Sequence, residues 1–233
     1  EGISEKELDS MAQSFHETQI SSIRSTCMSC GAVVPLWNNI PIISWFRQRG
    51  KALCCGGQLS LVYPVSEIVT PILALVAIGL SDSHWLTIFL FFAFVLMFVM
   101  SLIDFFLKIL PDQLTILLML SGLLGSASGI LWLSLESSIA GMLVGYFSFE
   151  VLRIGFRSIR GYEGLGQGDS KLMMALGVWL GPFAIPYIAG GAAIVGLLVV
   201  GILAIGGTKT SLRMELPFGP FLNLGGLICF VIA

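Results

Sequence analysis

Residues 84–103 read HWLTIFLFFAFVLMFVMSLI, and this stretch decides the fold because it contains no Asp, Glu, Lys or Arg. About 20 predominantly apolar residues are enough for one helix to cross the hydrocarbon core of a bilayer. The whole chain of 233 residues is 56% apolar and 11% charged, with a mean hydropathy of +0.93. That is too apolar for a surface that faces water, so the sequence predicts a membrane protein.

The composition also excludes several classes of protein. Charge is too scarce for a disordered chain, and five cysteines are too few for a disulfide-dense secreted module. The twelve Lys and Arg are scattered rather than gathered into the basic face that a nucleic-acid binder needs. We therefore expect contact with membrane lipid and no nucleic-acid partner.

Similar apolar stretches flank residues 84–103 on both sides. Residues 172–208 lack Asp, Glu, Lys and Arg throughout, which is long enough for two tight spans. The sequence thus predicts an all-α polytopic membrane protein with about seven transmembrane helices. They are expected within residues 61–80, 84–103, 114–135, 137–156, 172–208 and 216–233.

The loops between these stretches alternate in charge. The loops around Asp82, Glu136 and Pro182 contain no Lys or Arg, whereas the loops between them are basic. Because positively charged loops stay in the cytoplasm, the basic loops and the N-terminal region are expected on the cytosolic face. The basic residues concerned are Arg47, Arg49, Lys51, Lys108, Arg153, Arg157, Arg160, Lys171, Lys209 and Arg213.

Five carboxylates lie near the cytosolic ends of the predicted spans, namely Glu67, Asp104, Asp112, Glu150 and Asp169. Acidic groups beside or inside apolar spans are costly, so each is a functional candidate. Two facing carboxylates can cleave an amide by general acid and base catalysis without a metal or a nucleophilic Ser. Like charges held close cannot both ionise, so such a pair shares a proton.

Each carboxylate also has a simpler interpretation. Asp112 and Asp169 precede predicted spans and can act as helix N-caps. Glu67 and Glu150 can reach the membrane interface or pair with a basic residue.

Three glycines precede Asp169 in the stretch GLGQGD, residues 164–169. They superficially resemble a phosphate-binding loop, but no strand and no Rossmann unit surround them. We expect them to permit close backbone approach and unusual dihedral angles next to Asp169.

The first sixty residues are more polar than the rest and predict a separate cytosolic region, 1–60, with a cysteine module at 27–60. Cys27-Met-Ser-Cys30 is followed, after twenty-three residues, by Cys54-Cys55, like the two halves of a zinc ribbon. The adjacent pair departs from the usual spacing of two intervening residues. The module is therefore either a zinc site or a ribbon that keeps its fold after losing a ligand.

Taken together and in this order, the motifs closely resemble those of the bacterial type IV prepilin peptidases. These are GxGD-type intramembrane aspartic proteases that serve type IV pili and type II secretion. The resemblance covers nearly everything from Cys27 onward. It is carried by Cys27-x-x-Cys30, Asn39-Ile40-Pro41, Ser44-Trp45, Arg49-Gly50-Lys51, Leu59-Ser60, Tyr63-Pro64 to Glu67, Ile103-Asp104, Leu110-Pro111-Asp112, Leu114-Thr115, Gly164 to Asp169, Lys171-Leu172 and Pro217 to Phe221.

The resemblance implies a membrane endopeptidase in residues 61–233, in the bacterial inner membrane, with its active site facing the cytosol. It implies cleavage of prepilin or pseudopilin leaders after a Gly and before a Phe, followed by methylation of the new amine with S-adenosylmethionine. The pilus or type II secretion machinery would be its partner. The residues implied are Asp104 and Asp169 as catalytic pair, Gly166, Gly168, Lys171 and Glu67 as support, and Cys27, Cys30, Cys54 and Cys55 as zinc ligands.

Two features depart from the family pattern. The family's second cysteine knuckle begins at the position of Ala52, so zinc ligation by both adjacent thiols, by three thiols or by none stays open. The family's first span has no counterpart after Glu1, so eight spans in the family correspond to the seven expected here.

Two other functions remain as alternatives. An ion- or proton-coupled transporter also uses membrane carboxylates, but it predicts internal repeats and broken helices near the midplane, which the sequence does not show. A catalytically silent scaffold organised by the cysteine module is the second alternative.

Overall fold

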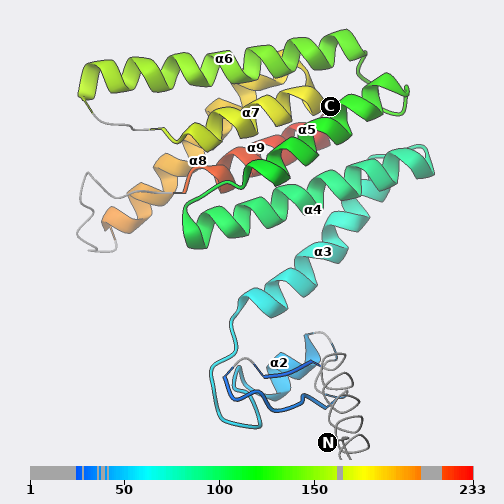
Figure 1. Ribbon diagram of the computed structural model, residues 1–233, viewed down its shortest axis with the longest axis vertical. Coiled ribbons are helices and arrows are strands. Elements are labelled where there is room, and N and C mark those ends of the chain that lie inside the picture. The colour runs from blue at the N-terminus through cyan, green and yellow to red at the C-terminus, as the bar shows by residue number, and fades with distance from the viewer. Residues whose placement is uncertain are drawn as a thin grey trace, which may run out of the picture. The chain divides into compact units, whose positions relative to one another are not determined.

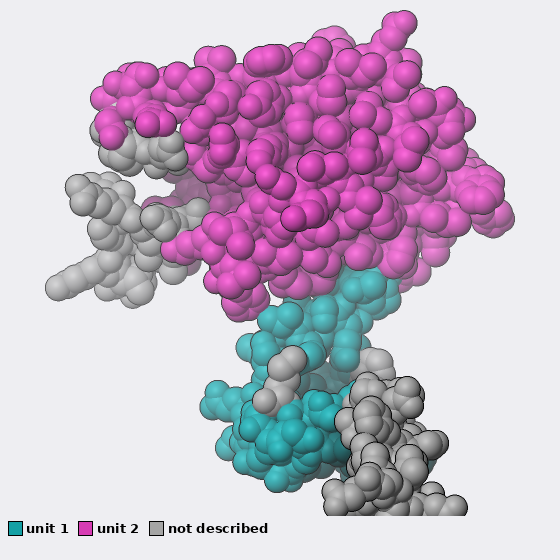
Figure 2. Space-filling view, in the orientation of Figure 1, with its two compact units in different colours: residues 1–72 teal, residues 73–233 magenta. Residues whose placement is uncertain are grey.

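The computed structural model describes residues 25–27, 29–35, 37, 40, 42–161, 165–205 and 217–232. The chain divides into two compact units, Glu1–Ile72 and Leu73–Ala233, which Figure 2 colours separately. Helices dominate the second unit, whereas the described part of the first unit combines α2 and the start of α3 with turns and two isolated antiparallel bridges near the cysteines. The helices, shown in Figure 1, are α2 (Ile43–Arg47), α3 (Val62–Gly79), α4 (His84–Leu107), α5 (Asp112–Ala127), α6 (Leu135–Arg160), α7 (Gln167–Leu180), the 3-10 turn η2 (Pro182–Ala184), α8 (Ile185–Ile205) and α9 (Gly219–Ile232).

Helices occupy every stretch in which a span was expected, so the all-helical membrane character is confirmed. Within the described residues, four helices are long and apolar enough to cross a membrane: α3, α4, α6 and the helix formed by η2 and α8. Helices α5, α7 and α9 are shorter, at 16, 14 and 14 residues. The expectation that residues 114–135 form one span is wrong at its C-terminal end, because α5 ends at Ala127 and Gly129 adopts a left-handed φ of 69°.

Local capping sets the bounds of the two longest helices. Ser83 Oγ accepts a hydrogen bond from the Leu86 N–H and starts α4, and Ser134 Oγ does the same for Ser137 N–H at the start of α6. Both helices end at a residue in the left-handed region, Lys108 after α4 and Gly161 after α6. The left-handed Lys108 turns the chain directly after the helix that carries Asp104.

Helix α7 is the centre of the second unit. It packs against α5, α6 and α9, and Figure 1 shows these helices side by side. Trp179 is fully buried, and its Nε1 donates a hydrogen bond of 2.8 Å to the carbonyl oxygen of Leu118 on α5. Helix α7 is therefore held on several sides at once, which fixes the residues at its N-terminal end.

Glycines bring α6 and α7 into backbone contact. A Cβ atom built on Gly141 would fall on the carbonyl oxygen of Gly177, and one built on Gly177 would fall on that of Gly141. Gly145 lies against the backbone of Met173 in the same way. Only glycine permits such an approach at these positions. We call Gly141, Gly145 and Gly177 the glycine seam; it sets the distance between α6 and α7.

The first unit contains two short turns of similar shape. In one, Cys27 N–H bonds to Ala32 O, and in the other Ala52 N–H bonds to Gly57 O, each at 2.8 Å. The bridges Thr26↔Val33 and Lys51↔Gln58 flank these turns. The four thiols Cys27, Cys30, Cys54 and Cys55 are carried by the two turns.

Candidate active site and cysteine cluster

Asp104 lies one turn before the end of α4 and is only 6% exposed. Its Oδ2 accepts a hydrogen bond of 2.9 Å from the backbone N–H of Gly219, the first residue of α9. A Cβ atom at residue 219 would lie 2.7 Å from that oxygen. Glycine at this position is therefore what allows the start of α9 to approach the carboxylate.

Asp169 lies in the first turn of α7 and is 7% exposed. Its Oδ2 accepts a hydrogen bond of 3.2 Å from the N–H of Gly166, the residue that precedes the helix. Asp169 is thus the third residue of α7 and bonds back to the cap position; the interpretation of Asp169 as the N-cap residue is wrong by three positions. Gly166 has an ordinary extended conformation, with φ −70° and ψ 145°, so the expected unusual dihedral is not found there.

The helix ends that carry the two carboxyl groups share one packing partner. Leu110, in the turn after α4, fills the space beside both. A Cβ atom built on Gly168 would lie 2.9 Å from the Cβ of Leu110. One built on Gly219 would lie 3.3 Å from the Cδ2 of Leu110. Gly168 thus permits the close approach expected of the glycines before Asp169, while Gly164 lies outside the described residues. The ends of α4, α7 and α9 converge on two buried carboxylates.

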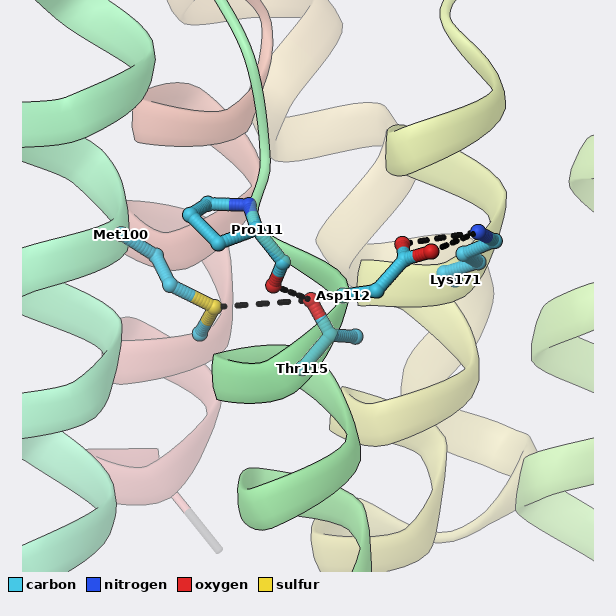
Figure 3. A network of polar contacts seen from close by, with 5 residues as sticks. All are labelled: Met100, Pro111, Asp112, Thr115 and Lys171. Carbon is cyan, nitrogen blue, oxygen red and sulfur yellow. Dashed lines mark hydrogen bonds and ion pairs between the residues drawn. The ribbon is translucent and has the colours of Figure 1, made fainter.

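Asp112 and Lys171 form an ion pair between α5 and α7 beside this site. Lys171 Nζ lies 2.7 Å from both carboxylate oxygens of Asp112, as Figure 3 shows. The cap interpretation of Asp112 is wrong, because Pro111 occupies the N-cap position and the side chain of Asp112 faces Lys171. Thr115, one turn on, donates from its hydroxyl to Pro111 O at 3.2 Å (Figure 3). The start of α5 is tied in this way to the helix that carries Asp169.

Glu150 pairs with a basic residue on its own helix, as one of its two interpretations expected. The Arg153 guanidinium donates to both of its carboxylate oxygens, at 2.6 Å and 3.1 Å. Glu150 is therefore engaged by an arginine, and within the described residues no hydrogen bond or ion pair joins it to Asp104 or Asp169.

Asn223 is a buried polar residue that sequence reasoning missed. It is 4% exposed, and its Nδ2 donates two hydrogen bonds of 2.9 Å across to α4, to Met97 O and to Ser101 Oγ. An amide within the apolar run of α9 was the available signal, since a polar group in such a stretch needs a partner.

The first unit brings all four thiols of the cysteine module together. Their Sγ atoms lie within 4.8 Å of one another, with Cys27–Cys55 at 3.8 Å, Cys30–Cys54 at 3.4 Å and Cys54–Cys55 at 3.9 Å. A tetrahedral zinc with Zn–S bonds of about 2.3 Å has S···S edges of about 3.8 Å. The four thiols therefore fit a zinc ion, and the adjacent cysteines do not prevent it.

The electrostatics of this cluster differ from thiol to thiol. Backbone N–H groups of Ser29 and Cys30 lower the pKa of Cys27 from 9.0 to about 6, because they stabilise the thiolate. Hydrogen bonds to Cys30 and Cys27 raise the pKa of Cys54 to about 12. The backbone therefore favours the thiolate at Cys27, and the neighbouring thiols disfavour it at Cys54.

Beside the cluster lies a cavity of about 800 Å³, formed within the first unit. Glu67 lines it and accepts a hydrogen bond at Oε2 from the backbone N–H of Ile42, just before α2. The Nε1 of Trp45 is buried and has no hydrogen-bond partner among the described residues. Its lining combines aromatic and apolar side chains, among them Ile40, Trp45, Leu59 and Tyr63, with Ser, Thr and Gln side chains and the carboxylate of Glu67, a mixture found in small-molecule sites.

Comparison with protein families gives two matches that together cover most of the chain. Residues 90–201 match the type IV leader peptidase family, and residues 8–80 match the bacterial peptidase A24 N-terminal domain. No solved structure matches the chain.

Several curated bacterial proteins named prepilin leader peptidase/N-methyltransferase are similar over almost the whole chain. That of Pectobacterium carotovorum is 38% identical over 89% of this chain and 74% of its own length. Those of Burkholderia pseudomallei and Dichelobacter nodosus are 35% and 37% identical over 87% and 89% of this chain. The chain spans 65% and 70% of these two relatives' own lengths.

Proposed function

Because the chain belongs to the type IV leader peptidase family, we propose that it cleaves prepilin leaders with an aspartate pair, Asp104 and Asp169, and then methylates the new N-terminus. The family is bacterial and its members are multi-pass membrane proteins. The observation that carries the proposal is that two buried carboxylates, at the ends of α4 and α7, lie at helix ends that pack against the same Leu110 side chain.

The chemistry follows from one proton shared between the two carboxyl groups. The ionised group takes a proton from water, and the water oxygen attacks the scissile carbonyl carbon, while the protonated group donates to the carbonyl oxygen. The tetrahedral intermediate then collapses: the carboxyl group that took the proton from water gives it to the amine nitrogen, the C–N bond breaks, and the other carboxylate takes back a hydroxyl proton as the carbonyl re-forms. No metal or nucleophilic side chain is required for this sequence of steps.

Backbone N–H groups orient both carboxylates for this reaction. Gly219 N–H engages Oδ2 of Asp104, and Gly166 N–H engages Oδ2 of Asp169. Among the described residues neither Oδ1 has a hydrogen bond of its own, so these two oxygens are available to water and to the shared proton. Gly168 supports the pair by admitting Leu110 to its side.

The substrate is a prepilin or pseudopilin, cut on the cytosolic side between a Gly and the Phe that begins an apolar helix. The basic loops support this orientation, since Lys108 follows α4 directly after Asp104. We propose that all seven helices, including the shorter α5, α7 and α9, take part in crossing the bacterial inner membrane. The pilus or type II secretion machinery receives the product.

Cleavage of a synthetic prepilin by the purified protein tests the pair. Asp104→Asn and Asp169→Asn should each lower kcat about 10²- to 10⁴-fold, and the double variant should be no slower than the worse single variant. Glu136→Gln, an exposed carboxylate in the first turn of α6, is the matched control and should cleave normally. Normal cleavage by either folded Asp→Asn variant would refute the pair.

The methyl donor of this family, S-adenosylmethionine, supplies an electrophilic methyl group on a sulfonium when it is bound. We assign it to the cavity of the first unit, where Trp45 and Tyr63 offer aromatic faces and Glu67 a negative charge. The buried Trp45 Nε1 without a partner fits a donor that awaits an acceptor on a ligand. The volume of about 800 Å³ lies in the range of small-molecule sites.

Direct binding tests this assignment apart from catalysis. Calorimetric titration of the purified protein with S-adenosylmethionine should show one site, weakened about tenfold or more by Glu67→Gln. Prepilin cleavage by the same variant should stay unchanged. Wild-type affinity in Glu67→Gln and in Trp45→Phe would place the donor elsewhere.

We assign zinc to Cys27, Cys30, Cys54 and Cys55, where it joins the two turns of the first unit. Metal analysis of the purified protein should give one zinc per chain. Cys54→Ser should lose it, whereas Cys229→Ser, in α9, should retain it. Full zinc content in Cys54→Ser would mean that three thiols are sufficient.

A further inference from the structure

The side chain of Asn223 joins two helices whose ends form the proposed active site. Helix α9 reads GPFLNLGGLICFVI, so Asn223 is a lone amide within an otherwise apolar run. Its Nδ2 donates to Met97 O and to Ser101 Oγ, both on α4 and both at 2.9 Å. Ser101 Oγ in turn donates to Met97 O at 2.7 Å, so the three groups form a closed network.

The orientation of the amide is dictated by its partners. Met97 offers a carbonyl oxygen, which can only accept, so the Asn223 NH₂ group must face it. The Asn223 Oδ1 is buried and has no hydrogen-bond partner among the described residues. The amide therefore has one orientation in which both N–H donors are bonded. This orientation fixes the position of α9 along the axis of α4.

The network and the proposed catalytic carboxylate lie on the same faces of the same two helices. On α9, Gly219 and Asn223 are four residues apart, and on α4, Ser101 and Asp104 are three apart, both spacings that place side chains on one face. The helices run in opposite directions here, since residue 219 meets residue 104 and residue 223 meets residue 101. One turn of helix thus separates the amide network from the Gly219–Asp104 hydrogen bond.

Apolar packing alone does not define this register well. A slide of α9 along α4 exchanges one apolar contact for another, whereas it leaves a buried amide without partners. The backbone of Gly219 lies so close to Asp104 that a Cβ there would lie 2.7 Å from Asp104 Oδ2, so α9 has little room to move at this point. A displacement of about 1 Å would break the hydrogen bond between the Gly219 N–H and the carboxylate.

We propose that Asn223 is a positioning residue for cleavage: its bonds to Met97 and Ser101 set the register of α9 on α4, so that the Gly219 N–H meets Asp104. The proposal rests on the proposed catalytic role of Asp104. Asn223 touches neither the substrate nor the reacting atoms; it acts through Gly219.

Kinetics of prepilin cleavage by Asn223→Leu, which keeps the volume and loses the hydrogen bonds, tests the proposal. We expect kcat to fall about tenfold or more, because the carboxylate loses its oriented donor, while KM stays within about twofold. The matched control is Ser126→Ala, which breaks a buried hydrogen bond of 2.6 Å between Ser126 on α5 and Ser138 on α6. It should lower the melting temperature without lowering kcat.

A double-mutant cycle separates positioning from general loss of stability. Gly219→Ala places a methyl group against Asp104 Oδ2 and should itself lower kcat strongly. If Asn223 acts through Gly219, Asn223→Leu combined with Gly219→Ala should be no slower than Gly219→Ala alone. Multiplicative losses in the double variant would overturn the proposal, as would an equal fall in kcat for Ser126→Ala.

The proposed function and the positioning role fail in different ways. Normal cleavage by Asp104→Asn would refute the aspartate pair, whereas an inactive Asp104→Asn with a fully active Asn223→Leu would refute the positioning role alone. Should Asn223→Leu fail to accumulate, Ser101→Ala removes one of the two acceptors and should lower kcat about twofold to fivefold. An unchanged kcat in Ser101→Ala would then overturn the proposal.

Discussion

The carboxylate pair of the second unit and the thiol cluster of the first unit are held in different ways. Asp104 and Asp169 are 6% and 7% exposed, and backbone N–H groups from neighbouring helix ends bond to each. Cys30, Cys54 and Cys55 are exposed, and only two short turns carry them. One site is therefore shaped by packed helices, and the other is carried by two turns that the proposed zinc ion would join.

The difference has a functional consequence. Helix packing supplies the rigid arrangement that the proposed cleavage by two carboxylates requires. The proposed zinc would supply local order to turns that have few buried side chains around them in the described part of the first unit. We therefore expect damage to the helix packing to affect both stability and cleavage, and damage to the cysteine cluster to affect methylation alone.

The largest expected effect comes from the glycine seam of the second unit. Gly177→Val places two methyl groups on the Gly141 backbone, so we expect the protein not to fold into a cleavage-competent form. Gly155→Val on α6, where a Cβ meets nothing within 4 Å, is the control and should accumulate normally. The yield and melting temperature of the detergent-purified variants measure this; a normal melting temperature for Gly177→Val would contradict the packing account.

Metal removal is expected to have the next largest effect, confined to the first unit. Treatment with a strong zinc chelator should abolish methylation of a cleaved pilin, because the turns at Cys27 and Cys54 lose their common ligand. Cleavage rates measured in the same sample should stay unchanged. Parallel loss of both activities would show that the two sites are not separate in the way proposed.

A pH dependence of metal retention follows from the thiols. The pKa of Cys27 is lowered from 9.0 to about 6, so its thiolate contribution is complete above pH 9 and is lost as the pH falls through about 6. Zinc affinity should accordingly fall steeply below about pH 6, as protons compete for the thiolates. Zinc release followed with a coloured chelator between pH 5 and pH 8 measures this, and pH-independent retention would contradict it.

The smallest effect is expected at the Asp112–Lys171 ion pair. This exposed pair can be compared with the buried glycine contacts of the same unit. The two side chains are 56% and 35% exposed, so screening leaves such a pair worth about 0.2–1 kcal/mol. Lys171→Met should lower the melting temperature slightly, and the reversed pair Asp112→Lys with Lys171→Asp should restore part of it. A loss as large as that of Gly177→Val would mean that the pair does more than join α5 to α7.

Much of the helical architecture could be predicted from hydropathy, because long apolar runs such as residues 84–103 leave few alternatives. The ends of α5 and α7 could not, since they depend on the turns at Gly129 and Gly181, each with a left-handed φ. Hydropathy also does not distinguish a helix that crosses the membrane alone from a shorter one packed among others.

The carboxylates of the site could be selected because charged groups in apolar surroundings are rare, but their partners could not be identified. The position of Asp112 before a predicted span favours a cap, while its partner Lys171 lies on another helix. Asn223 and Gly219 act through contacts with α4 more than a hundred residues away in sequence. Such long-range pairs depend on helix packing, which local sequence patterns do not encode.

The most direct test of the separation between the two sites is methylation of a pilin whose leader has already been removed. The substrate, which begins with Phe, is incubated with labelled S-adenosylmethionine and with wild-type protein, Asp104→Asn or Glu67→Gln. The account predicts that Asp104→Asn methylates this pilin at the wild-type rate although it cleaves no prepilin, and that Glu67→Gln shows the reverse. Loss of methylation in Asp104→Asn, or normal methylation in Glu67→Gln, would contradict it.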